Sequence, residues 1–152
     1  LVSYNRYLDG HQHDCREIGP FPNNTEFMVA SASPLPVNDS FDLITVLNVI
    51  DCVPDPEVFL TSLYSSLNPG GFMLVTSPYS WGSDDVPVDR WIGGTSEQSS
   101  AAALIAFFKS LKLEIIAERD NIPWVLREHK RWYRVFYNHC VLVRKVALEN
   151  AM

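Results

Sequence analysis

The stretch from residue 39 to residue 81 constrains the fold more than any other part of the chain, because it sets out a strand, a helix, a turn and a second strand in that order. Phe41–Leu47 is a short apolar run rich in Ile, Val and Thr, a composition typical of a strand buried on both faces of a sheet. Residues 72–76 have the same character and predict the next buried strand.

The helix between these strands is predicted from its boundary signals. Asp55 can cap a helix with Pro56 at its first position, where the missing amide hydrogen costs nothing. Val58, Leu60, Leu63 and Leu67 then recur roughly three to four residues apart and predict one apolar stripe. The run Asn-Pro-Gly-Gly at residues 68–71 predicts the exit turn, because proline cannot continue a helix and glycine adopts positive φ freely.

A strand, a crossover helix and a second strand of these lengths predict parallel, right-handed pairing in an open α/β sheet. Ligands bind such sheets at the carboxyl ends of the strands. Four polar residues follow the two predicted strands there: Asn48, Asp51, Ser77 and Tyr79. We expect the functional site at this edge.

The remaining segments fit around this unit. Residues 1–25 are polar and predict an irregular connecting segment with one helical turn at residues 4–8, and residues 26–152 are predicted to form the domain proper. Within it we expect a short strand at 26–31, a long functional loop at 78–94, a helix at 96–110 capped by Ser96, and an antiparallel strand pair at 112–119 and 132–144.

Composition narrows the class of protein. A chain of 152 residues that is 47% hydrophobic suits one domain with a real core. The net charge of −6 argues against an extended nucleic-acid surface, and no apolar run approaches the ~20 residues of a membrane helix. Three widely spaced cysteines indicate no disulfide framework, so we expect a soluble protein of the cytoplasm, with an organelle interior as the alternative.

Two polar clusters have competing interpretations. His11, His13 and Cys15 alternate with polar residues, a pattern more typical of a solvated loop than of a metal site, so we predict no metal. The basic cluster at residues 127–134 could bind an acidic partner or RNA phosphates, although a charged face is usually only solvated, so nucleic acid is not the predicted ligand.

Three strings carry a resemblance to a known family. They are NVIDCVPDPEVFL at residues 48–60, TSPYSWGSDDVPVDRWIGG at 76–94 and IPWVLREHKRWYRVFYNHCVLVRK at 122–145. Over about residues 26–145 the chain resembles the methyltransferase domain at the C-terminus of the ovothiol-biosynthesis enzyme, the mercaptohistidine N-methyltransferase part of the 5-histidylcysteine sulfoxide synthase family. The resemblance implies the second half of a class I, Rossmann-like methyltransferase sheet, mostly parallel with a C-terminal antiparallel strand pair.

The same resemblance implies transfer of a methyl group from S-adenosylmethionine to an imidazole nitrogen of a thiol-substituted histidine. It assigns Asp51 and Tyr79 to catalysis, and Asp51 is also placed to meet the methionine end of the cofactor or the substrate. Asn48 is placed to meet the cofactor, as are Ser31 and Ala32, which stand where this fold usually has an acidic residue near adenine. The implied substrate-binding residues are Trp81, Arg127 and His129. Each also has a structural reading as a loop cap, as core packing or as half of a salt bridge.

One departure from the family concerns the residues before position 26. A class I methyltransferase begins with a strand, a glycine-rich loop and a helix, and only Gly10 and Gly19 precede the predicted sheet here. The first two strands of the fold and the glycine loop are therefore missing from the pattern, which would leave the Phe41–Leu47 strand without a neighbour. We expect either residues 26–31 or a second polypeptide to cover that edge. The alternative function is a non-catalytic methyltransferase-like subunit that packs in a larger complex.

Overall fold

The computed structural model describes residues 2–8, 11–18, 22–32, 36, 39–129 and 131–147. The chain divides into two compact units, of which one comprises residues 1–29 with 125–135 and the other residues 30–124 with 136–152. The second unit contains the β-α-β element and the candidate site, so the fold is described mainly there.

The first unit differs from the irregular segment predicted for residues 1–25. β1 (Val2–Leu8) and β2 (His11–Ile18) pair antiparallel, with Val2 opposite Ile18 and Leu8 opposite His11. No helical turn forms at residues 4–8. The sequence of residues 2–18 lacks the alternation of apolar and polar side chains that predicts a strand. These strands are defined by hydrogen bonds between the two backbones, and the pattern of side chains does not reveal such bonds.

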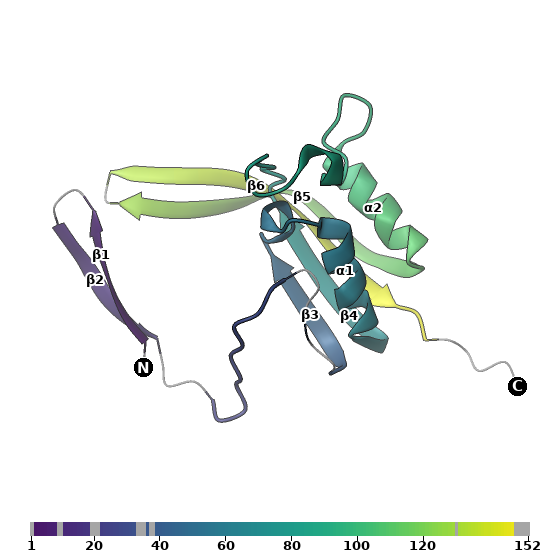
Figure 1. Ribbon diagram of the computed structural model, residues 1–152, viewed down its shortest axis with the longest axis horizontal. Coiled ribbons are helices and arrows are strands. Elements are labelled where there is room, and N and C mark those ends of the chain that lie inside the picture. Colours follow the sequence, from purple (N-terminus) through teal and green to yellow (C-terminus); the bar gives the residue numbers. More distant parts are fainter. Residues whose placement is uncertain are drawn as a thin grey trace, which may run out of the picture. The chain divides into compact units, whose positions relative to one another are not determined.

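A four-stranded sheet has the order β3-β4-β6-β5, with strands β3 (Phe41–Leu47), β4 (Leu67–Ser77), β6 (Trp132–Lys145) and β5 (Leu113–His129) (Figure 1). Residues 125–135, where β5 ends and β6 begins, belong to the first unit, and the remainder of the sheet belongs to the second. β3 and β4 pair parallel, which confirms the predicted adjacency, and β4 and β6 pair antiparallel. In the described part of the chain, parallel pairing is confined to β3 and β4. The predicted α/β fold is confirmed.

The helices agree with their predicted positions but shift at their ends. α1 (Pro56–Ser65) begins after Asp55, whose Oδ1 accepts a hydrogen bond from the amide of Val58 at 3.0 Å. α2 (Ser100–Ser110) is capped by Ser99 rather than by the predicted Ser96. Two short 3-10 turns, Ile50–Cys52 and Val88–Arg90, lie in the loops after β3 and β4.

Two strands are longer than predicted. β4 begins at Leu67 and includes the Asn-Pro-Gly-Gly run, which we expected to be a turn, and its register with β3 shifts between Phe41 and Leu43. The irregular register lets a proline and two glycines stay within a strand. β5 runs over 17 residues, far past the predicted end at residue 119.

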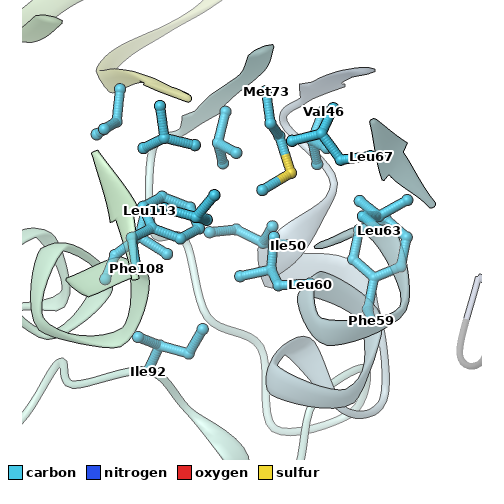
Figure 2. Close-up of a cluster of buried hydrophobic side chains, with 14 of the residues drawn as sticks. Val46, Ile50, Phe59, Leu60, Leu63, Leu67, Met73, Ile92, Phe108 and Leu113 are labelled. Carbon is cyan, nitrogen blue, oxygen red and sulfur yellow. The ribbon is translucent and has the colours of Figure 1, made fainter. Parts of the chain in front are cut away.

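Both helices pack on one face of the sheet, where a single apolar cluster forms (Figure 2). Met73 and Val75 of β4 are buried two residues apart, as expected when one face of a strand meets the core. Phe59, Leu60 and Leu63 of α1 and Leu104 and Phe108 of α2 complete the cluster from the helical side.

The edge strand β3 is the main correction to the predicted sheet. We expected it to be buried on both faces, yet Val46 is its only buried residue, and Leu43 is 60% exposed. Residues 26–31 form no strand, so the strand predicted there is wrong, and so is the first of the two alternatives for covering β3. A strand forms only where a neighbour accepts its hydrogen bonds, and among the described residues β3 pairs with β4 alone.

Candidate functional site

The candidate site lies where β3 and β4 end, and two residues there have unusual backbones. Asn48, directly after β3, has φ 58°, and Tyr79, two residues after β4, has φ 53°. Asparagine tolerates this left-handed conformation, whereas for a bulky residue such as tyrosine it costs free energy. Strained residues of this kind concentrate at functional sites, because the surrounding structure holds them in place.

Asn48 joins three strands. Its Oδ1 accepts hydrogen bonds from Oγ1 of Thr76 at 2.9 Å and from Nδ2 of Asn138 at 2.8 Å, which belong to β4 and β6. Its backbone amide donates to the carbonyl of Thr76 at 2.9 Å. The oxygen is thus used structurally, and the side-chain amide nitrogen is the group left to donate to a ligand.

Asp51 is a buried carboxylate, only 2% exposed. Its Oδ2 accepts hydrogen bonds from the amide nitrogen and Oγ of Ser80, at 2.9 and 2.8 Å. Its Oδ1 is buried with no hydrogen-bond partner in the described part of the chain, and the same holds for Oδ1 of Asn138. Desolvation first, and then the charges of Asp51 and Asp85, raise the pKa of the neighbouring Cys52 thiol.

A buried carboxylate oxygen without a donor among the described residues is costly, and a bound group that donates a hydrogen bond to it would remove that cost. The acceptor would suit a hydrogen-bond donor, and a positively charged donor most of all. Asp51 is therefore suited to bind an ammonium group.

Aromatic rings form a row from the end of β4 into the following loop. The Tyr79 and Trp81 ring centroids lie 6.2 Å apart with their planes 28° apart, and Trp81 stacks on Trp91 at 6.1 Å and 15°. Trp81 Nε1 donates to Oγ of the buried Ser100, at the start of α2, at 2.8 Å. Because Tyr79 and Trp81 already contact each other, a ligand ring would lie beside the row rather than between these two rings.

Glycine is required beside this row. At Gly94, where φ is +74°, an added Cβ would lie 3.1 Å from Oγ of Ser100 and 3.2 Å from Trp81 Nε1. A side chain there would crowd both Oγ of Ser100 and the Trp81 ring, and so would disturb the hydrogen bond that orients the indole. The glycine thus keeps the Trp81 ring in place.

Tyr79 also begins a chain of hydrogen bonds across the sheet. Its hydroxyl lies 2.7 Å from Nδ1 of His139 on β6, and Nε2 of His139 lies 2.9 Å from Oε1 of Glu118 on β5. Burial, followed by the charges of Asp120, Glu118 and Asp51, raises the pKa of Tyr79 well above its usual value. The phenol therefore stays neutral around neutral pH.

Sequence reasoning missed His139, Glu118 and Asn138. A signal existed, because the string at residues 122–145 contains Asn138 and His139 side by side. What the string does not indicate is that His139 lies opposite Ser77 in the register of β6 with β4, which brings the imidazole to the end of β4.

The other predicted site residues are distributed as follows. Ser31 and Ala32 lie in irregular chain before β3, with Ser31 exposed and Ala32 packed against the core. Arg127 and His129 lie on β5 in the other compact unit, where Glu128 pairs with Arg134 and the His129 ring meets Trp132 edge-on at 5.9 Å. The roles of these four residues in binding stay predictions.

No three potential metal-binding side chains gather among the residues whose side chains the structure describes, and the side chains of residues 11–15 are not among these. No helix in the described ranges is long and apolar enough to cross a membrane.

Comparisons with known proteins agree with the fold. A family model described as "Methyltransferase domain" matches residues 4–152. A structure of a S-adenosylmethionine-dependent methyltransferase from Methanosarcina mazei is similar with a TM-score of 0.56 and 18% identity, covering 85% of this chain and 73% of that one. A comparison with curated proteins finds no match.

A second similar structure is a complex between the Haloferax volcanii Trm112 methyltransferase activator and a methyltransferase, with a TM-score of 0.59 and 16% identity. The match covers 84% of this chain and 64% of that one, so the chain spans somewhat under two thirds of that protein's length. At these identities the similarity shows the fold.

Proposed function

Because the chain belongs to the methyltransferase-domain family, we propose that it transfers the methyl group of S-adenosylmethionine to an imidazole nitrogen of a thiol-substituted histidine, as in ovothiol biosynthesis, in the cytoplasm. The observation that carries the site assignment is the buried Oδ1 of Asp51 at the carboxyl end of the sheet, which has no hydrogen-bond partner among the described residues. The specific acceptor follows from the three sequence strings that resemble the ovothiol family.

The residues at this edge fit the methionine end of the cofactor. Its α-ammonium group is a charged donor, which is what the unpartnered carboxylate oxygen of Asp51 requires. Asn48 would add a donor through its amide nitrogen, and Ser31 and Ala32 are proposed to lie near adenine. When bound, S-adenosylmethionine supplies an electrophilic methyl group.

The acceptor is proposed to lie beside the aromatic row. Trp81 presents an indole whose orientation is set by its hydrogen bond to Ser100, and an imidazole beside the row can pack edge-on against such a ring. The prediction that Arg127 and His129 bind the carboxylate of a substrate concerns the other compact unit and is separate from this site. In-line displacement needs alignment and exclusion of water more than it needs charged catalysts, so rings held in place can contribute much of the rate.

One edge of β3 pairs with no strand in the described part of the chain, and it supports a further component of the proposal, a second polypeptide that adds a strand there. Leu43 and Leu47 are more than half exposed, and Ile44, Val46, Val49, Phe59 and Leu63, with Thr45, line a groove of about 240 Å³ beside the same strand. Apolar side chains and unpaired backbone groups on one edge favour addition of an apolar strand.

Hydrogen exchange tests this component. We expect the amides of residues 43–46 that are not bonded to β4 to exchange orders of magnitude more slowly in protein isolated with its bound partners than in the separated chain. The α1 amides serve as the internal control, because their hydrogen bonds lie within one helix in both samples. Equally fast exchange of the β3 amides in both samples would contradict a covering strand.

The alternative function is a non-catalytic packing subunit, and the same exposed residues on β3 favour it. A single experiment separates the two functions. The purified protein is titrated calorimetrically with S-adenosylhomocysteine and then incubated with S-adenosylmethionine and thiol-substituted histidine, with product measured by mass spectrometry. We expect saturable heat and a methylated product, and much less product from histidine without the thiol. Absence of both heat and product would identify the packing role.

A further inference from the structure

Alignment of the methyl donor with its acceptor does not require the hydrogen bonds that link Tyr79, His139 and Glu118, so these three side chains can have a further role. These hydrogen bonds join the end of β4 to β6 and β5, with links of 2.7 and 2.9 Å between side chains that are far apart in sequence. The Tyr79 backbone is held in place as well, because its amide donates to Oγ of Ser77 at 2.9 Å. The tyrosine hydroxyl is therefore fixed relative to the imidazole.

The direction of the hydrogen bonds follows from their chemistry. An ionised carboxylate accepts and never donates, so the link to Glu118 places a hydrogen on His139 Nε2. In the neutral ring Nδ1 is then an acceptor, and it receives the hydrogen of the Tyr79 hydroxyl. The lone pairs of the tyrosine oxygen are consequently left to accept a hydrogen from another group.

The side chains in this series of hydrogen bonds are buried to different degrees. The His139 side chain is 3% exposed, whereas that of Glu118 is 51% exposed and meets solvent. Burial first, and then the charges of Asp120, Glu118 and Asp51, raise the pKa of the phenol and oppose its ionisation. Tyr79 can therefore accept a proton only if it passes its own hydrogen to His139 at the same time.

We propose that Tyr79, His139 and Glu118 form a relay that removes a proton from the methyl acceptor, an N–H heterocycle such as an imidazole. The idea rests on the proposed function. The acceptor's lone-pair nitrogen forms the new bond to the methyl carbon as the sulfur–methyl bond breaks. The proton on its other nitrogen passes to the Tyr79 oxygen, the Tyr79 hydrogen passes to Nδ1 of His139, and Glu118 stabilises the imidazolium. Tyr79 is the catalytic residue of the relay, and His139 and Glu118 act through it.

The first test needs no cofactor. Nitrogen-15 NMR of the histidine side chains is expected to show His139 protonated on Nε2 and bare on Nδ1. Adding imidazole as a probe should shift the Nδ1 resonance in the wild type and in Tyr137→Phe, which alters an exposed tyrosine of β6, but not in Tyr79→Phe. Protonation of Nδ1 with a bare Nε2, or an equal imidazole response in Tyr79→Phe, would overturn the relay.

The second test compares two acceptors, imidazole and 1-methylimidazole, at saturating concentration. Only imidazole carries an N–H proton that the relay can remove during methyl transfer. Tyr79→Phe should therefore lower the kcat for imidazole by about 100-fold and leave the kcat for 1-methylimidazole nearly unchanged, since general base catalysis contributes roughly 10²–10⁴. Glu118→Gln keeps an acceptor for Nε2 but lacks the charge, and its loss should be intermediate. Equal losses for both acceptors would mean a structural role. If the wild type methylates neither, the proposed function fails, and the NMR result decides whether the relay exists.

Discussion

Replacing Asp51 with asparagine is expected to weaken the binding of S-adenosylhomocysteine by about 10- to 100-fold. Hydrogen bonds to charged groups contribute roughly 1.5–3 kcal/mol, and each ~1.4 kcal/mol is tenfold in affinity. Asparagine has nearly the same shape, and its oxygen can still accept from Ser80 at the position of Oδ2. Its NH₂ group would then occupy the position of the unpartnered Oδ1 and face the ligand ammonium with a donor instead of an acceptor.

Calorimetric titration measures this effect, and thermal unfolding shows whether the variant is folded. Asp84→Asn is the matched control, because it removes the same charge from an exposed position in the following loop and should leave affinity within about twofold, as expected for a solvated charge. Unchanged affinity in a folded Asp51→Asn protein would show that the buried carboxylate does not bind the cofactor.

Replacing Phe108 with alanine is expected to lower the free energy of unfolding by about 3–5 kcal/mol, the usual cost of truncating a buried phenylalanine. Phe108 is fully buried in the cluster that joins α2 to the sheet, so its removal leaves a cavity lined by rigid neighbours (Figure 2). Since α2 also presents Ser100 to the indole of Trp81, loosening this helix should disturb the site as well.

Urea unfolding followed by circular dichroism measures this loss. The control is Phe107→Ala on the same helix, which changes the same residue type at a half-buried position and should cost clearly less. Equal losses from the two variants would mean that α2 packs on the sheet differently.

The β-α-β unit was predictable because its signals are local. Asp55 and Pro56 mark the start of α1, and the apolar residues of Phe41–Leu47 and of residues 72–76 mark the strands, whatever the remainder of the chain does. Parallel pairing followed from the crossover helix between them. Strand ends were less predictable, because the extension of β5 to residue 129 depends on its hydrogen bonding to β6.

The candidate site was predictable only in part, for the same physical reason. Asn48, Asp51 and Tyr79 follow β3 and β4 directly, so the order of elements alone places them at one edge of the sheet. The partners of these residues come from much later in the chain, since His139 lies 60 residues after Tyr79 and Asn138 lies 90 after Asn48. No local pattern encodes which of those side chains will meet.

The sequence by itself thus determined the β-α-β unit, its parallel pairing and the edge where its polar residues gather, because periodicity, caps and turn residues act over a few neighbouring positions. Only the tertiary structure decided that most of β3 is exposed, that Tyr79 bonds to His139 and that the buried Asp51 Oδ1 meets no donor within the described ranges. Exposure, burial of single atoms and hydrogen bonds between distant residues depend on strand order and register, which are set by contacts across the whole sheet.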